Sequence, residues 1–179
     1  MKTTRRVLWP ALLAVMALAP AGCKRHKSVQ VQDTIEEGPR MASTLRMGDP
    51  KVETQLVSGF YGIEGNAWRW TGKQFIVVLK TPFGAAQRGG TLTFNLAVPQ
   101  AVIENLKNIS LAPSVDGSPL APETFTQPGP AVFKRDIPAN LLGGDTVKVE
   151  FQLDKSYSPG GADTRELGVV ATSIALEPK

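Results

Sequence analysis

The feature that most constrains this chain is a two-residue alternation of apolar and polar side chains, repeated in short runs from Lys51 onward. The run 146–153, TVKVEFQL, alternates apolar with polar side chains throughout, and the run 91–98, TLTFNLAV, does the same. Successive side chains of a strand point to opposite faces of its sheet. A period of two therefore indicates strands that bury one face and expose the other.

Turn-forming residues separate these runs. Gly, Pro, Asn and Asp divide residues 51–179 into about eight apolar runs at roughly 8–15-residue intervals, which is the spacing of antiparallel all-β domains. We therefore expect one all-β domain over residues 51–179, an antiparallel sandwich or barrel of about eight strands. The stretch 99–108, PQAVIENLKN, is the only one with helical character.

Residues 1–22 have the pattern of an export signal. A basic start, MKTTRR, precedes an apolar stretch of about 13 residues, shorter than the roughly 20 that a membrane-spanning helix needs. Two cleavage modes fit this pattern. Ala19 and Ala21 form an A-x-A site for signal peptidase, whereas Ala21-Gly22-Cys23 resembles the lipobox of bacterial lipoproteins, in which the cysteine becomes diacylated. Pro20 departs from that motif, which usually has Leu at this position.

Cys23 is the only cysteine of the chain and stands where the lipobox requires it. This position favours lipidation over an incidental cysteine in a secreted protein. Lipidation would anchor the protein to a membrane without spanning it, in the bacterial cell envelope and facing the periplasm or the exterior. Residues 23–50 are polar and lack a sustained period, so we expect the lipidated cysteine to be followed by a flexible tether.

The charge of the chain belongs mostly to its N-terminal part. The formal net charge is +4, but Lys2, Arg5 and Arg6 lie in the signal segment, and the region from Lys51 onward has 12 basic and 12 acidic residues. A neutral domain lacks the basic excess that nucleic-acid binding requires, so we expect no nucleic-acid partner.

The residue types exclude several catalytic chemistries. The single histidine, His26, lies in the expected tether, and the domain has no cysteine. Histidine-dependent triads, cysteine nucleophiles and histidine zinc sites are therefore not expected, and we predict no catalytic residues, no metal and no cofactor. A carboxylate pair that hydrolyses glycosides is the enzymatic alternative, with Glu64, Asp163 and Glu166 as the acids in the most distinctive segments.

The segment 59–75, GFYGIEGNAWRWTGKQF, gathers aromatic and charged residues. On a strand, Trp68 and Trp70 share one face and Arg69 takes the other. If the Trp face is exposed, the two rings offer a platform for sugars, and if it is buried they belong to the core. We favour the core, since large aromatic side chains usually fill sandwich interiors, and an inward Arg69 would then need a partner.

Two motifs carry a resemblance to a known fold. The segment GFYGIEG…WRWTG contains Tyr61, Glu64, Arg69 and Trp70, and the segment SPGGADTRELGV contains Asp163, Arg165 and Gly168. Together with VDG and DIP between them, they resemble the galactose-binding-like jelly-roll domains found in bacterial envelope proteins and beside sugar-processing enzymes. The resemblance covers residues 55–177 and implies a β-sandwich (jelly roll) that binds carbohydrate or serves as an accessory module.

The resemblance also suggests how charges pair, because the first and last strands of a jelly roll can lie close together. We expect Glu64 to pair with Arg165, and Arg69 to pair with Asp163 or Glu166. The cluster of Tyr61, Glu64, Trp68, Arg69, Trp70, Asp163, Arg165 and Glu166 is thus either a ligand site or a structural charge network. Three functions fit: a non-enzymatic binding module for glycan, a glycan-processing enzyme with a carboxylate pair, and a module that docks another envelope protein.

Overall fold

The computed structural model describes residues 41–179. The signal segment 1–22, Cys23 and residues 24–40 lie outside the described residues, so export, lipidation and the tether stay predictions. None of the helices of the described part is long and apolar enough to cross a bilayer. The ten strands are β1 (Thr44–Arg46), β2 (Leu56–Glu64), β3 (Trp68–Lys80), β4 (Gly90–Val98), β5 (Ile109–Val115), β6 (Ser118–Pro119), β7 (Glu123–Phe125), β8 (Gly129–Ile137), β9 (Thr146–Leu153) and β10 (Val170–Pro178). The short helices are η1 (Pro50–Gln55), α1 (Ala85–Arg88), α2 (Gln100–Leu106) and η2 (Ala139–Leu141).

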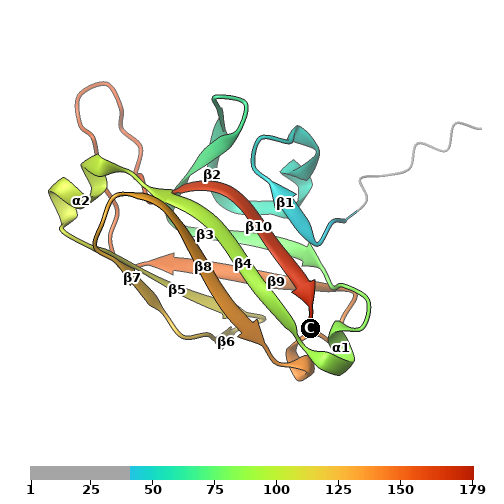
Figure 1. Ribbon diagram of the computed structural model, residues 1–179. Coiled ribbons are helices and arrows are strands. Elements are labelled where there is room, and N and C mark those ends of the chain that lie inside the picture. The colour runs from blue at the N-terminus through green and yellow to red at the C-terminus, as the bar shows by residue number, and fades with distance from the viewer. Residues whose placement is uncertain (1–40) are drawn as a thin grey trace, which may run out of the picture. The chain divides into compact units, whose positions relative to one another are not determined.

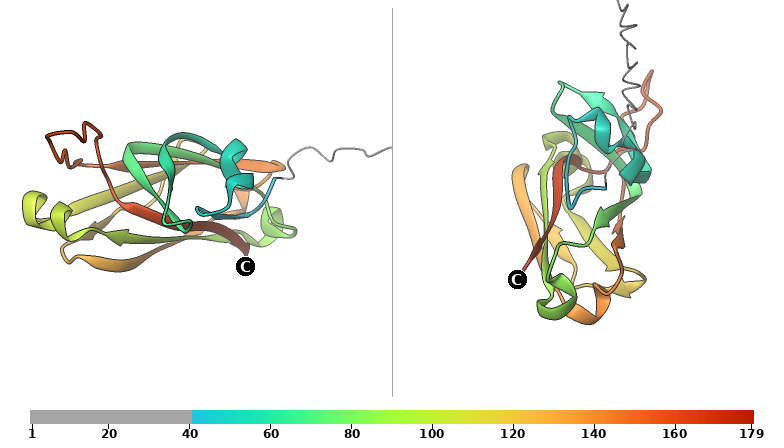
Figure 2. Two further views of the ribbon diagram at one scale, coloured as in Figure 1. Left: turned by 90° about the horizontal axis from the view of Figure 1, so that it is seen from above. Right: turned by 90° about the vertical axis from the view of Figure 1, so that its right-hand side faces the viewer.

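The strands form two antiparallel layers (Figures 1 and 2). One layer has the order β8-β4-β10, with β1 on β10, and the other has β3-β9-β5, with β2 on β3 and β6 and β7 on β5. Strand β10 pairs with β4 along its length but with β3 only at Val170↔Trp70 and Ala171↔Arg69. This short pairing is where the two layers are hydrogen-bonded to each other. This arrangement confirms the predicted antiparallel β-sandwich. It has ten strands rather than about eight because β1, β6 and β7 are too short to show an alternation.

The buried faces are those that the alternation predicts. Every second side chain of β4 and β9 is buried, and the side chains between them are half-buried or exposed. The centre of the core is aromatic: the ring of Phe75 on β3 stacks on that of Phe151 on β9 at 4.9 Å, and both contact Phe94 from the other layer. All three rings are fully buried, and each contributes about 1.5–3 kcal/mol of hydrophobic stabilisation. Phenylalanine thus joins the two layers.

The fold begins before residue 51, although the sequence assigned residues 41–50 to the tether. Strand β1 pairs with β10, and Leu45 and Met47 are fully buried. Buried Gln55 secures this segment, because its side chain bonds both backbone groups of Ala42 and the carbonyl of Val78 on β3. Strand β1 has only three residues, which is too short for an alternation to be recognised in the sequence. Its pairing with β10 and its buried side chains show that this segment belongs to the sandwich.

Two glycines of the distinctive motifs are required by close packing. Gly59 has φ of 77°, and a Cβ there would lie 1.9 Å from the carbonyl oxygen of Gln74, at an irregularity of the β2–β3 pairing. At Gly168 a Cβ would lie 2.4 Å from Leu153 and 2.6 Å from both the Thr71 hydroxyl and the Gly72 carbonyl. The chain before β10 can therefore approach β3 only because position 168 has no side chain.

We predict that Gly168→Ala lowers the free energy of unfolding by about 1–3 kcal/mol, because the added methyl must displace packed neighbours. The matched control is Gly62→Ala, since a Cβ at exposed Gly62 meets nothing within 4 Å. Urea unfolding monitored by circular dichroism measures both variants. Equal midpoints for the two would contradict the close-approach explanation.

Candidate functional site

Six of the eight residues singled out by sequence lie at one end of the sandwich. There the β2–β3 hairpin lies beside the loop 154–169, which connects β9 to β10 (Figure 1). The backbone of this loop pairs with itself at Tyr157 and Leu167 and then with β3, where Gly168 donates to the carbonyl of Thr71. Six side chains form what we call the hairpin-end cluster: Tyr61, Glu64, Trp68, Trp70, Asp163 and Arg165.

Arg165 is the centre of this cluster. Its Nη1 lies 2.9 Å from Oε1 of Glu64, and its Nη2 lies 2.8 Å from Oδ2 of Asp163. The guanidinium carbon lies 5.3 Å from the centre of the Tyr61 ring, within the range of a cation–π contact. The Tyr61 hydroxyl donates to the backbone carbonyl of Glu166 at 3.1 Å. One cation on the loop is thus held by two carboxylates and one ring.

The predicted pairing of Glu64 with Arg165 is confirmed. Asp163 pairs with Arg165 and not with Arg69, for which Asp163 or Glu166 was the expected partner. The side chain of Glu166 is exposed and forms no ion pair within the described residues, so this position contributes only its carbonyl.

The charges of this cluster are fixed by their hydrogen bonds. The side chain and backbone amide of Arg165 both donate to Asp163 and hold the pKa of that carboxyl below its usual value of 3.8. In turn, the hydrogen bonds to Asp163 and then to Glu64 raise the pKa of Arg165. Both members of the Asp163–Arg165 pair therefore stay charged over the whole physiological range. Their side chains are half-buried, so they remain reachable from solvent.

The prediction that Trp68 and Trp70 mainly serve the core is wrong for Trp68. The inward positions of β3 are taken by Arg69 and Thr71, in phase with Phe75 further along, so the two tryptophans lie on the outward face. Trp70 packs against the edge of the core, and both side chains are half-buried. The rings meet edge to face, with 6.3 Å between centroids and 79° between planes. They do not form a flat two-ring platform.

Arg69 has a different partner from those predicted. It is only 4% exposed, and its Nη2 lies 2.6 Å from Oε2 of Glu53 on η1. Its other nitrogens donate to the carbonyls of Met47 and Tyr61. Glu64 stands opposite Trp68 in the β2–β3 register, so the Glu64–Arg165 pair lies on the face away from Arg69, beyond reach of its guanidinium. The partner Glu53 was missed because nothing in the sequence spacing links it to Arg69.

The described residues contain no group of three or more His, Cys, Asp or Glu side chains placed to hold a metal ion. What the hairpin-end cluster offers is a half-buried indole opposite a carboxylate, which is itself paired with a guanidinium.

No family model and no curated protein matches the sequence. Among solved structures, the chain is similar to a GH115 4-O-methyl-α-glucuronidase, BtGH115A, with specificity for decorated arabinogalactans (TM-score 0.45, 10% identity, 91% of this chain and 19% of the enzyme). It is also similar to a family 35 carbohydrate-binding module from Clostridium thermocellum (TM-score 0.44, 13% identity, 75% of this chain and 97% of the module). A CBM4 structure has a TM-score of 0.36 with 13% identity, covering 76% of this chain and 85% of that one.

These comparisons place carbohydrate-binding modules, the class that the sequence resemblance implies, among the structural neighbours. The chain spans only about a fifth of the glucuronidase. At such identities and TM-scores the likeness does not transfer a ligand or an activity to this chain, and any function has to be argued from the site itself.

We predict that Arg69→Met lowers the free energy of unfolding by about 2–4 kcal/mol, because two carbonyls lose a charged donor inside the protein. The matched variant Arg165→Met removes ion pairs that are half-exposed and should cost far less. Urea denaturation gives both values. An Arg165 variant less stable than the Arg69 variant would contradict this ranking.

We also predict an acid-dependent loosening of the loop 154–169. The pKa of Asp163 is lowered in the folded protein, so its stabilising contribution is complete above the ordinary value of 3.8 and is lost as the pH falls through the folded pKa. Carboxyl carbon NMR titration should show this lowered pKa, and Arg165→Met should return it toward 3.8.

Asp136 serves as the internal control for that titration. Its pKa is also lowered, but by the hydrogen bond from Lys179, so Arg165→Met should leave it unchanged. An Asp163 pKa that does not respond to loss of Arg165 would contradict the assigned cause.

Proposed function

We propose that the folded unit is a non-enzymatic carbohydrate-binding module of an exported, lipid-anchored envelope protein, and that its sugar binds at the hairpin-end cluster. The observation that carries the proposal is the outward, half-buried face of Trp68 and Trp70 beside Glu64 and Arg165. Ligand sites for small molecules combine aromatic surface with a few well-placed polar groups. A sugar ring matches both features: its apolar face of C–H groups stacks on an aromatic ring, and its hydroxyls form hydrogen bonds with the polar groups.

The charged pair supplies the polar half of such a site. A carboxylate accepts hydrogen bonds from two neighbouring hydroxyls, and a guanidinium donates in a fixed planar fork. Glu64 and Arg165 already orient each other, so their remaining donor and acceptor positions are held in place before a ligand arrives. Preorganisation of this kind reduces the entropy lost on binding.

The angle between the two indole rings limits the size of the ligand. Because their planes differ by 79°, only one ring can stack on the face of a given sugar while the other meets its edge. This geometry fits one sugar ring, such as the end of a glycan chain, better than an extended chain over a flat platform.

The enzymatic alternative is disfavoured at this cluster by its charges. Glycoside hydrolysis needs one carboxyl group that carries a proton near neutral pH. Here Asp163 has a lowered pKa, and Glu64 is paired with Arg165 at 2.9 Å. Asp163 is thus held as a carboxylate and is not poised to protonate a leaving group.

The protein-docking alternative lacks a continuous apolar patch within residues 41–179. The large exposed apolar side chains there are Val57 on β2, Phe83 before α1 and Val132 on β8, which belong to separate parts of the sandwich. Apolar residues scattered in this way do not make a docking patch for another protein. Attachment to the envelope rests on the lipobox-like sequence around Cys23 and on the apolar stretch before it.

A glycan array probed with the purified protein tests the ligand. We expect binding to glycans with an accessible terminal ring, and we expect Trp68→Ala to weaken it at least about tenfold, as loss of an aromatic anchor does. Trp68→Phe should retain part of the affinity.

Phe83→Ala is the matched control, since Phe83 is an exposed aromatic residue at the other end of β3. It should leave glycan binding unchanged. Absence of any glycan signal for the wild-type protein, or equal losses for Trp68→Ala and Phe83→Ala, would contradict the proposed site.

A further inference from the structure

The loop between β3 and α1 exposes an aromatic side chain that the proposed sugar site does not use. Phe83 is 99% exposed, whereas the six other phenylalanines, all of which lie in the described part of the chain, are buried or half-buried. The loop is well anchored, because Thr81 donates to the carbonyl of Asp145 and Ala85 donates to that of Pro82. The ring is therefore held out in water by a fixed backbone, where its apolar surface gains nothing from the fold.

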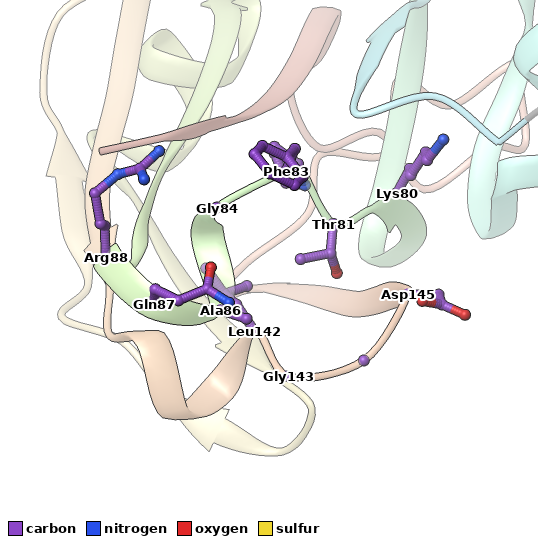
Figure 3. Close-up of a pocket in the computed structure, with 12 residues that line it drawn as sticks. Lys80, Thr81, Phe83, Gly84, Ala86, Gln87, Arg88, Leu142, Gly143 and Asp145 are labelled. Carbon is purple, nitrogen blue, oxygen red and sulfur yellow. The ribbon is translucent and has the colours of Figure 1, made fainter.

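Basic side chains flank this ring. Figure 3 shows Lys80 and Arg88 on either side of Phe83, above a hollow of about 800 Å³ that Leu142 and Gly143 also line. Arg88 donates to the backbone oxygen of Lys179, and Asp145 is the acidic residue that lines this hollow. An aromatic ring between a lysine and an arginine suits the boundary between lipid headgroups and acyl chains, where apolar side chains insert and basic ones meet phosphate.

The described chain begins at this same end. Lys80 donates its backbone N–H to the carbonyl of Ala42, and Met41, Lys80, Asp145 and Thr146 line one hollow. Residues 24–40 separate this point from Cys23, and 17 residues can span at most about 60 Å. Strand β3 has 13 residues and is about 40 Å long, and it separates this end from the hairpin-end cluster. A tether from Cys23 would therefore join the sandwich at the Phe83 end, away from the hairpin-end cluster.

We propose that the Phe83 end of the sandwich is a membrane-contact surface, on which Phe83 inserts between the headgroups of an anionic bilayer while Lys80 and Arg88 bind lipid phosphates. This inference rests on the membrane-anchoring part of the proposed function and not on glycan binding. It assigns the two ends of β3 to different partners: lipid at Phe83 and ligand at Trp68.

Site-specific fluorescence on the full, unprocessed chain tests the contact. A Cys23→Ser, Phe83→Cys chain is labelled with the environment-sensitive dye NBD and mixed with phosphatidylethanolamine–phosphatidylglycerol vesicles, with the N-terminal apolar stretch retained as the attachment. We expect the dye at position 83 to shift to the blue and to brighten at least about twofold as it leaves water. The matched label, Cys23→Ser, Glu166→Cys, sits on an exposed residue of the opposite end and should not change.

The outcomes separate the contact from the anchor. A chain that sediments with the vesicles while the dye at position 83 stays in water overturns the contact and leaves the anchor intact. A shift at position 166 without one at position 83 overturns the assigned orientation. A chain that does not sediment with the vesicles overturns the contact, whatever the glycan array shows, and it does not bear on lipidation because this chain has Ser at position 23.

The basic residues give a second, independent measurement. Lys80→Gln with Arg88→Gln in the labelled chain should reduce the signal from position 83 at least about twofold on anionic vesicles and leave it unchanged on neutral ones. These side chains are exposed, so the variants keep the fold. An equal signal from both chains on anionic vesicles would remove lipid phosphate from the proposal.

Discussion

The buried guanidinium of Arg69 is the interaction on which the rest of this sandwich depends. A charge taken out of water is costly unless it is paired and hydrogen-bonded, and Arg69 has partners in three segments that precede it in the chain: β2, η1 and the turn before η1. The carbonyl of Met47 fixes the first segment against β3, Glu53 fixes η1, and the carbonyl of Tyr61 fixes β2. Because Arg69 occupies the inward position, its neighbours Trp68 and Trp70 must face outward. The aromatic part of the candidate site thus follows from a charge buried on the other side of the strand.

The sequence predicted those features that follow from local rules. The alternation in β4 and β9 fixed which faces are buried, because it repeats over eight or nine residues. The alternation could not reveal β1, which has only three residues. The orientation of Trp68 was predicted wrongly because its aromatic type was given more weight than the inward phase that Phe75 sets along β3. The partner of Arg69 could not be predicted, since the position of Glu53 depends on how η1 packs in three dimensions. The Glu64–Arg165 pair was predicted from the resemblance, as the alternation does not relate residues so far apart.

The distinctive motifs carry more structure than ligand chemistry. Gly59 and Gly168 are needed where two backbones approach closely, Arg69 is a buried hydrogen-bond centre, and Leu167 is buried. These residues therefore serve to close the fold at the β2–β3 hairpin. A ligand would contact groups that the fold does not need, namely the exposed part of Trp68 and the unused hydrogen-bonding positions of Glu64 and Arg165.

The separation of the two ends of β3 gives the proposed arrangement a physical rationale. If the ligand site lay beside the lipid, headgroup phosphates would compete with the ligand for the guanidinium of Arg165, because phosphate and carboxylate are strong partners for arginine. Placing Arg165 about 40 Å from the Phe83 end removes it from the headgroup layer and beyond several Debye lengths of the surface charge at physiological salt. Arg165 also has both of its carboxylate partners within the protein, so loss of either one would free it for other anions. Glu64→Gln should therefore widen the range of acidic sugars bound while Trp68 continues to supply the stacking face, and a glycan array of that variant measures the change.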